Sequence, residues 1–336
     1  IRDDLVTGVQ TCALPISQMI WSDCYAALAL AADRTSRIKL GTGVAVSGTR
    51  SAPVNAASIA TINALAPGRT FFGIGTGNTA MRVMGKAPQR IAEYDDYLTT
   101  LKPLLRGEEA VFEGKPIRHI MPDKGFVNFD DPIPLYVSGF APRSLGLAGK
   151  HGEGAVLASL RNPGVLEKLW DMVEAGAEKA GRTLDRDAFY MTSLTTIVVL
   201  EPGEAVDSTR VKHECGAMGT SALHYAYDQF RNFGKAPPAW ALEVWDDYTA
   251  LLEETPEAIR HQRIHQGHNC WVLPEEERFL TPSVLRASAM IGTQDELLER
   301  LSALKAAGLD QIMILPNFDP RFEVLEKTAK ALIGNV

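Results

Sequence analysis

Cysteine is scarce in this chain, and the spacing of the few residues present excludes a disulfide framework. Four cysteines occur in 336 residues, at Cys12, Cys24, Cys215 and Cys270. Small secreted folds held together by disulfides carry cysteine in closely spaced pairs instead. The pattern favours a reducing compartment, and we expect a cytoplasmic protein.

Long hydrophobic runs and a surplus of positive charge are missing as well. No apolar run approaches the ~20 residues that a membrane-spanning helix needs, and the apolar opening lacks the basic segment of a secretory signal. Lys and Arg number 34 against 41 Asp and Glu, which gives a formal net charge of −7. This balance argues against nucleic acid or an anionic membrane as the main partner.

The residues that are present have the composition of an ordinary globular protein, with 46% hydrophobic and 22% charged residues. The length permits one large α/β barrel or two ordinary domains. Because the sequence shows no internal repeat and no low-complexity linker, a single domain with insertions is the simplest interpretation.

Six short apolar runs alternate with helical patterns along the chain. Repeated βα units with continuous apolar strands imply a parallel sheet covered on both faces, as in an α/β barrel of the (β/α)8 type. The predicted strands are residues 37–46, 70–75, 133–139, 154–159, 188–200 and 311–316. The predicted helices are residues 23–35, 51–65, 91–105, 141–152, 162–181, 293–308 and 321–332.

Two stretches interrupt this alternation and are interpreted as insertions after the fourth and seventh strands of the barrel. They cover about residues 108–133, where Glu113-Gly114 predicts the turn of a small hairpin, and about residues 201–286. The clearest local signals lie farther on, where Thr293 and Glu296 form a capping box and open a helix.

A glycine-rich loop, "FFGIGTGNTA", follows a predicted strand and satisfies the loose dinucleotide pattern Gly75-x-Gly77-x-x-Ala80. That pattern also needs an acidic residue at the end of a second strand about twenty residues on. Asp95 and Asp96 stand near that distance, but they lie inside a predicted helix. A Rossmann-type NAD(P)-dependent dehydrogenase therefore remains an alternative that lacks its second strand.

The same loop can instead be one of several barrel loops. Three predicted strands end in "LGTGV", "GIGTGN" and "YVSGF", which are rich in Gly, Ser and Thr. Active sites of α/β barrels lie at the carboxyl ends of the strands, and glycine lets a planar group approach the backbone. Any one of these loops could be only a tight turn. Together they favour the floor of a site for an extended aromatic cofactor with a phosphorylated tail.

At these residues the sequence resembles the luciferase-like monooxygenase superfamily, whose members use FMN or the deazaflavin coenzyme F420, and in particular its methylenetetrahydromethanopterin reductase-like branch. Residues 35–78 are similar to the third and fourth βα units of that family. Residues 133–157 are similar to its fifth strand, fifth helix and sixth strand, and residues 291–316 to the unit that closes its barrel.

The resemblance implies a cofactor site at three strand ends. In the deazaflavin branch the third strand ends in a bulge with a cis peptide between non-proline residues, and here the resemblance places the bulge at Gly43-Val44 or very near it. Some members carry Glu at the position of Asn78, whose amide can hydrogen-bond but cannot transfer a proton. The implied cofactor residues are Thr42, Gly43, Val44, Gly75, Thr76, Gly77, Asn78, Ser138, Gly139 and Phe140.

Trp21 is a further candidate for the active site, because family members often carry an aromatic or polar active-site residue shortly after the second strand. A tryptophan here could stack against a ligand. It could equally be a helix-entry aromatic that packs on the rim of the barrel, and both interpretations stay open.

The opening of the chain, "VTGVQTCALPIS" at residues 6–17, fits neither a helix nor a strand. It back-translates in frame into a common high-throughput sequencing adapter, so we expect residues 1–16 to be translated adapter sequence. Residues 17–336 are then a single barrel domain that lacks its first one to two βα units. Such a barrel has unpaired edges, which predicts poor solubility or weak cofactor binding.

"HQRIHQGHNCW" places His261 and His265 one helical turn apart, with His268 and Cys270 just beyond. The spacing permits a metal site, a polar cluster of an active site or a surface helix end. Gln262 stands where a zinc protease has its catalytic Glu, so we expect no metal. His265 and His268 are predicted to contact the substrate or a cofactor phosphate, and their unperturbed pKa of about 6.5 suits general acids.

The sequence thus predicts a flavin- or deazaflavin-dependent oxidoreductase or monooxygenase that acts on a small organic substrate by hydride transfer or oxygen activation. The cofactor is coenzyme F420 or FMN, and we expect a homodimer or higher homo-oligomer. A non-catalytic flavin-binding relative is a further alternative. The candidate catalytic residues are Trp21, Asn78, His265 and His268.

Overall fold

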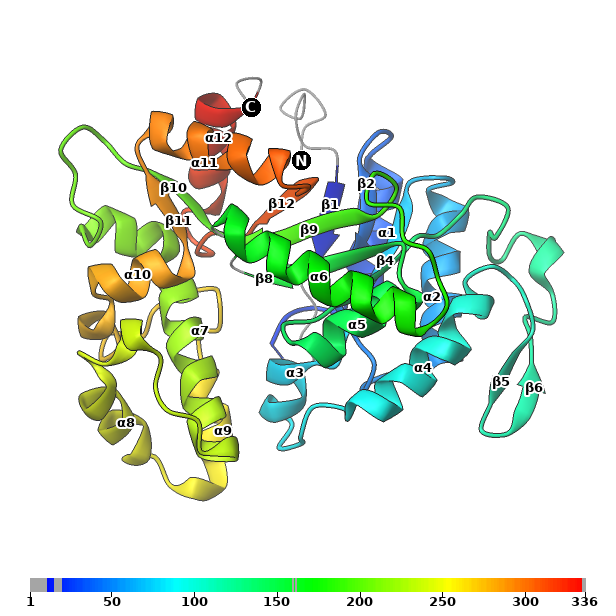
Figure 1. Ribbon diagram of the computed structural model, residues 1–336, viewed down its shortest axis with the longest axis horizontal. Helices are drawn as coiled ribbons and strands as arrows, with labels where there is room; N and C mark the ends of the chain where they lie inside the picture. The colour runs from blue at the N-terminus through cyan, green and yellow to red at the C-terminus, as the bar shows by residue number, and fades with distance from the viewer. Residues whose placement is uncertain (1–10, 15–19, 159, 161, 334–336) are drawn as a thin grey trace. The chain divides into compact units, whose positions relative to one another are not determined.

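The computed structural model describes residues 11–14, 20–158, 160 and 162–333 (Figure 1). The chain divides into two compact units, of which unit 1 comprises residues 1–157 and 167–192 and unit 2 comprises residues 158–166 and 193–336. Most of the predicted adapter segment lies outside the described residues. Its described part, 11–14, forms a strand.

Unit 1 contains a parallel sheet, as the sequence predicts. Its strands follow the order β1, β2, β4, β7, β8 and β9, and the short β3 pairs with the end of β4. Successive pairs from β1 to β8 are parallel, with Leu40 opposite Thr70 and Phe72 opposite Leu135. The strands are β1 (Thr11–Leu14), β2 (Lys39–Thr42), β3 (Ala45–Val46), β4 (Thr70–Gly75), β7 (Leu135–Ser138), β8 (Gly154–Ala158) and β9 (Tyr190–Thr195).

Helices alternate with these strands and contact one another in succession, α1 with α2, α2 with α4 and α4 with α5. Local signals fix their ends, since the Asp23 carboxylate caps α1 by accepting from the Ala26 N–H at 3.0 Å. Pro53 lies in the first turn of α2, where its missing N–H costs nothing. The helices are α1 (Cys24–Arg34), α2 (Ala52–Leu65), α3 (Asn78–Val83), α4 (Ile91–Leu104), α5 (Pro142–His151) and α6 (Pro163–Lys179).

The predicted hairpin is present as β5 (Ala110–Phe112) and β6 (Lys115–Ile117), which pair antiparallel. Glu113 and Gly114 both have positive φ, 50° and 76°. A two-residue hairpin turn whose twist matches that of its strands requires this conformation. A short 3-10 helix, η2 (Pro122–Lys124), follows the hairpin.

The core of unit 1 lies along β4, all six residues of which are buried. The aromatic rings of Phe71, Tyr136 and Tyr190 stack in a row across three strands, with 5.2 Å between successive centroids. Burial of this kind on both faces is what a continuous apolar strand indicates. The row joins β4 and β7 to β9 across the intervening β8 and so helps to position the ends of these strands.

Unit 2 is mainly helical around α7, which packs against α10 and η4. The Ser208 hydroxyl caps α7 by accepting from the Val211 N–H at 3.2 Å, and Gly234 ends the helix with φ 63°. The predicted capping box of Thr293 and Glu296 is confirmed at α11. The elements are β10 (Ile197–Val199), α7 (Thr209–Phe233), η3 (Ala239–Ala241), α8 (Trp245–Glu253), α9 (Glu257–Ile264), η4 (Glu277–Phe279), α10 (Pro282–Ser288), β11 (Met290–Gly292), α11 (Gln294–Ala306), β12 (Gln311–Ile314) and α12 (Arg321–Leu332).

The predicted single strand over residues 188–200 is wrong, because the chain breaks at Thr196 into β9 and β10. The Thr195 carbonyl accepts from the Leu315 N–H at 2.8 Å, beside β12, while the Thr196 carbonyl accepts from the Met290 N–H at 2.8 Å. The backbone thus changes partners at this point and β10 pairs with β11. The sequence analysis missed β11 altogether, since three residues are too few for a visible period.

The prediction of an α/β fold with a parallel sheet is confirmed, whereas the missing βα units stay a prediction. None of the described helices is long and apolar enough to cross a membrane. Cys24, Cys215 and Cys270 are buried and form no disulfide.

Candidate functional site

The carboxyl ends of β2, β4 and β7 meet in unit 1, and the residues there are the ones that the glycine loops single out. A Cβ atom added to Gly75 would lie 3.2 Å from Cγ2 of Val44 and 3.3 Å from Cβ of Ser138. Val44, Gly75 and Ser138 are therefore adjacent, although they are far apart in the sequence. We call the strand ends formed by residues 42–44, 75–78 and 138–140 the cradle.

The peptide bond between Gly43 and Val44 is cis. This is the position at which the family resemblance places a cis peptide between non-proline residues. The bond immediately follows β2, whose last residue, Thr42, is fully buried. The Thr42 hydroxyl donates to the Gly73 carbonyl at 2.5 Å, so this side chain joins β2 to β4.

Hydrogen bonds fix the end of β4 from two sides. The Ser47 N–H donates to the Gly75 carbonyl at 3.0 Å, and the Ser47 hydroxyl donates to the same oxygen at 3.2 Å. On the other side the phenol of Tyr94 donates to the Ile74 carbonyl at 2.7 Å. These contacts hold the backbone of the cradle in one conformation.

Gly77 and Asn78 form the turn from β4 into α3. Gly77 has φ 75°, and a Cβ atom there would lie 2.2 Å from Cγ1 of Val46. The Asn78 side-chain oxygen accepts from Nε of Arg82 at 3.1 Å. Sequence analysis did not single out Arg82, a nearly buried cation whose spacing of four residues from Asn78 on one helix face was the available signal.

Ser138, Gly139 and Phe140 connect β7 to α5. The Ser144 hydroxyl oxygen accepts from the N–H groups of Phe140 and Ala141, both at 3.2 Å, which fixes this loop to the first turn of α5. The Phe140 side chain is 58% exposed. An exposed ring at the end of a buried strand is available for contact with a ligand.

Trp21 lies in the bend ahead of α1 and is half-buried. Two residues later Asp23 forms an ion pair with Arg50, whose guanidinium lies 4.8 Å from the centroid of the Tyr25 ring. Of the residues that precede Trp21, the structure describes only 11–14 and 20. Both interpretations of Trp21, stacking on a ligand and packing on the rim, stay open.

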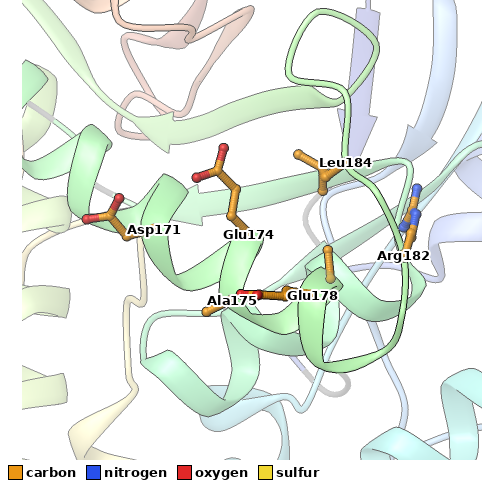
Figure 2. A pocket seen from close by; sticks show the side chains of 7 residues that line it. Asp171, Glu174, Ala175, Glu178, Arg182 and Leu184 are labelled. Carbon is orange, nitrogen blue, oxygen red and sulfur yellow. The ribbon is translucent and has the colours of Figure 1, made fainter.

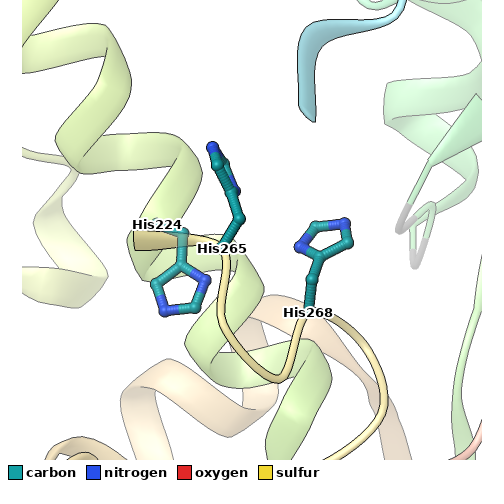
Figure 3. Close-up of side chains that lie close together, drawn as sticks. All are labelled: His224, His265 and His268. Atoms are coloured by element: carbon teal, nitrogen blue, oxygen red, sulfur yellow. The ribbon is translucent and has the colours of Figure 1, made fainter. Parts of the chain in front are cut away.

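Unit 2 brings His265 and His268 together with a third histidine, His224 of α7 (Figure 3). The predicted pairing of His261 with His265 on one helix face is wrong, because α9 ends at Ile264 and His265 is already its C-cap. Sequence analysis missed His224. Its signal was the spacing of four residues between His224 and Asp228, which puts both on one face of α7.

Buried carboxylates surround these histidines. Oε1 of Glu276 lies 3.3 Å from Nε2 of His224 and 3.1 Å from Nη1 of Arg263. Burial alone would raise the pKa of Glu276, but the contacts with His224 and Arg263 outweigh it and hold the pKa below its usual value. Oδ2 of Asp228 lies 3.3 Å from Nε2 of His265. Because its pKa is lowered, Glu276 is ionised at neutral pH.

The pKa of His268 is held well below its usual value by burial, and the neighbouring His265 and His224 lower it further. Its imidazole is therefore neutral at neutral pH. A neutral imidazole is an acceptor and a metal ligand, whereas a general acid must carry the proton that it donates.

A hollow on α6 contains none of the predicted site residues (Figure 2). Two of its charged groups are engaged elsewhere, since Glu174 pairs with Arg186 and Arg182 donates to the carbonyls of Gly149 and Gly152. These contacts stabilise the end of α6, so we assign this hollow no role. Its lining residues are Asp171, Glu174, Ala175, Ala177, Glu178, Arg182 and Leu184.

The chain was compared with known families and proteins. A family model described as luciferase-like monooxygenase matches residues 7–311. A 5,10-methylenetetrahydromethanopterin reductase of Methanolobus tindarius is 32% identical over 192 residues, which are 53% of this chain and 58% of that protein. An F420-dependent glucose-6-phosphate dehydrogenase of Nakamurella multipartita is 34% identical over 45% of this chain and 47% of its own length. The chain thus spans about half the length of these two curated relatives.

A longer alignment joins this chain to a 5,10-methylenetetrahydromethanopterin reductase of Archaeoglobus fulgidus, 26% identical over 86% of this chain and 80% of that protein. Among solved structures, a coenzyme F420 dependent tetrahydromethanopterin reductase from Methanopyrus kandleri is similar with a TM-score of 0.66 and 18% identity. The alignment covers 96% of this chain and 90% of the reductase.

A type II Baeyer-Villiger monooxygenase from Pseudomonas putida, solved in complex with FMN, has a TM-score of 0.59 and 16% identity, with 99% of this chain and 90% of that chain covered. At such low identity these likenesses show a shared fold alone. The fold is therefore one on which both F420-dependent and FMN-dependent proteins are built.

Proposed function

The chain belongs to the luciferase-like monooxygenase family, and on that premise we propose that it is an oxidoreductase that binds coenzyme F420 or FMN in the cradle. Its substrate is a small organic molecule. The observation that carries the proposal is the meeting of Val44, Gly75 and Ser138 at the ends of β2, β4 and β7.

The residues of the cradle fit a planar ring system. A Cβ atom at Gly75 would be crowded, at 3.2 Å from Val44 and 3.3 Å from Ser138, so glycine lets these strand ends lie close together. Glycine at such a position lets a flat group approach the backbone. Because Thr42, Ser47 and Tyr94 hold the strand ends by hydrogen bonds, the surface is pre-organised and loses little conformational freedom on binding.

Each part of the cradle has a distinct task in the proposal. Val44 and Gly75 support the face of the ring, and Thr76 and Gly77 border it on the side of α3. Ser138 and Gly139 border it on the side of β7. When bound, the deazaflavin or flavin ring supplies hydride transfer or, in the case of FMN, oxygen activation.

Asn78 acts by hydrogen bonding alone, because an amide cannot exchange a proton with a substrate. Arg82 fixes the orientation of its side chain. Phe140 offers an exposed aromatic face to the ligand, and Trp21 is a second aromatic candidate. We further propose that the sheet of unit 1 is part of the (β/α)8 barrel that the sequence predicts, with residues 108–133 and 201–286 as insertions.

The two carboxylates that could bind a ribose in a Rossmann-type dehydrogenase are not placed to do so. Asp95 and Asp96 lie in the middle of α4, not at the end of a strand. The Asp95 carboxylate contacts Nζ of Lys150 at 2.8 Å and Nε2 of His151 at 2.6 Å, and these contacts join α4 to α5. Asp95 is therefore engaged in packing and does not hold a ribose.

Spectral titration of the purified chain tests the proposal. Coenzyme F420 and FMN are added in separate experiments, and NADP serves as the comparison ligand. We expect saturable binding of one of the two ring systems at one per chain. Binding of the nicotinamide cofactor with no binding of F420 or FMN would contradict the proposal. FMN binding with rapid oxygen uptake in the presence of a reductase would decide against F420.

A pair of matched variants locates the bound ring. In Phe140→Ala we expect about tenfold weaker binding, because an aromatic contact and its buried area contribute about 1–2 kcal/mol. Phe126→Ala is the control, since Phe126 lies in the same unit and is 63% exposed, outside the cradle. Equal effects in the two variants would place the ring elsewhere.

A further inference from the structure

Three histidines from separate segments of unit 2 gather in one buried place (Figure 3). His224 comes from the middle of α7, His265 from the C-cap of α9 and His268 from the turn that follows. Their ligand nitrogens all lie within 4.8 Å of one another. The rings of His224 and His265 are nearly perpendicular, as are those of His265 and His268, with 6.2 Å and 5.8 Å between centroids.

His224 presents a free lone pair to this cluster. Its side chain is 1% exposed, and Nδ1 has no hydrogen-bond partner among the described residues. The other ring nitrogen, Nε2, faces the carboxylate of Glu276 at 3.3 Å. A carboxylate at Nε2 fixes the proton there, so Nδ1 is the nitrogen that can accept. This arrangement of carboxylate, histidine and open lone pair is the one in which histidines bind metal ions.

His265 also has a carboxylate partner, whereas His268 contacts a hydroxyl and a side-chain amide. His265 faces Asp228, which stands one turn after His224 on α7, at 3.3 Å. Nδ1 of His268 contacts the hydroxyl of Ser221 at 3.2 Å, and the Asn269 amide contacts Nε2 at 3.2 Å. Each of the three imidazoles is thus oriented by a polar neighbour.

Two buried carboxylates lie beside the cluster, Glu276 at His224 and Asp228 at His265. Carboxylates in this outer position orient metal-binding histidines and make them better ligands.

We propose that His224, His265 and His268 bind a divalent first-row transition metal of the zinc class, with Asp228 and Glu276 as outer partners. Three imidazoles without thiolates suit Zn²⁺ and also leave a fourth position open. Zinc–nitrogen bonds of about 2.0–2.1 Å put two ligating nitrogens about 3.3 Å apart. Small ring rotations therefore complete the site from its present spacing.

This site is independent of the proposed cofactor, because all its residues belong to unit 2 and the metal can be measured directly. The assignment also differs from the expectation drawn from the sequence, which gave His265 and His268 to the substrate and included no metal. The reason is His224, which makes a third ligand that the spacing of His261, His265 and His268 does not reveal.

The test is metal content of the untagged full chain after chelation, incubation with Zn²⁺ or Co²⁺ and gel filtration. We expect one metal ion per chain and, with Co²⁺, the visible absorption of a low-symmetry site. His224→Gln and His268→Gln should lower the affinity at least tenfold. His213→Gln on α7 and His261→Gln on α9 are the matched controls and should bind as the wild type does.

Histidine footprinting of the wild type keeps the test independent of how the variants fold. With diethyl pyrocarbonate, Zn²⁺ should protect His268, the one of the three that is not fully buried, while His213 and His261 stay reactive. Absence of bound metal in the wild type, or bound metal that protects none of the three histidines, would overturn the proposal and leave a neutral hydrogen-bonded cluster. Equal metal content in the cluster variants and the controls would overturn it as well.

Discussion

At the scale of single residues, the cradle depends on positions where a side chain does not fit. Gly77 combines a left-handed backbone with a neighbour, Val46, that occupies the place of its Cβ atom. Gly114 in the β5–β6 turn shares the backbone conformation but has nothing within 4 Å of that place. Comparing replacements at the two glycines therefore separates the free-energy cost of a left-handed backbone from that of a steric clash.

Gly77→Ala should therefore destabilise the protein more than Gly114→Ala. Both replacements add about 1–2 kcal/mol for a left-handed non-glycine residue, and Gly77→Ala adds the clash with Val46, about 1–3 kcal/mol. Urea unfolding measures both variants against the wild type. Adding Val46→Ala to Gly77→Ala should recover part of the loss, and the same addition to Gly114→Ala should recover none.

At the scale of elements, α7 begins with a network of charges. The Glu204 carboxylate accepts from the Ser208 hydroxyl at 2.7 Å, the Glu201 N–H at 3.0 Å and Nε of Arg210 at 2.9 Å. The hydrogen bond from Arg210 is the main cause that lowers the pKa of Glu204 to about 2. Because this side chain is only 13% exposed, the pair is not a fully solvated surface ion pair.

The network predicts a pH dependence of stability. Glu204 has a lower pKa in the folded protein than in the unfolded chain, so its contribution is present above about pH 4.5 and is lost as the pH falls towards 2. Arg210→Gln should lower the free energy of unfolding by about 1–3 kcal/mol at pH 7, and the deficit should shrink towards pH 3.

Arg90→Gln is the control for this prediction, because Arg90 pairs with Glu93 on the open surface, where its side chain is 82% exposed. We expect little change in stability from that variant at any pH. A deficit in Arg210→Gln that stays constant from pH 7 to pH 3 would show that the effect comes from packing and not from the ionisation of Glu204.

At the scale of the whole molecule, the residues of the cradle all belong to unit 1 and the histidine cluster belongs to unit 2. A ligand that binds the folded protein stabilises it by mass action, by about 2.7 kcal/mol at a concentration one hundred times Kd. The first effect is expected where the ligand makes contact, because local openings there become rarer.

Hydrogen exchange with saturating cofactor should therefore slow at the ends of β2, β4 and β7, in peptides that contain residues 42–48, 75–80 and 137–141. The β5–β6 hairpin, residues 110–117, is the internal control and should exchange at its original rate. Mass spectrometry of the exchanged peptides gives both results in one experiment. Protection of the hairpin without protection of the three strand ends would place the cofactor outside the cradle.

The sequence by itself determined the features that depend on neighbours along the chain. The capping box of Thr293 and Glu296 and the turn at Glu113-Gly114 follow from residues within one turn of each other, as do most of the strand and helix positions. The family resemblance added the position of the cis peptide at Gly43-Val44. The glycine-rich loops of the sequence also indicated the strand ends that form the cradle.

Only the tertiary structure decided the features that depend on residues far apart. The strand after Tyr190 breaks because the Thr195 carbonyl pairs with Leu315 and the Thr196 carbonyl pairs with Met290. Local β propensity cannot indicate either of these distant partners. His224 joins the histidine cluster because the packing of α7 brings it to Glu276, 52 residues away. Periodicity reports the face on which a side chain lies, whereas the folded packing alone fixes which distant side chain meets it.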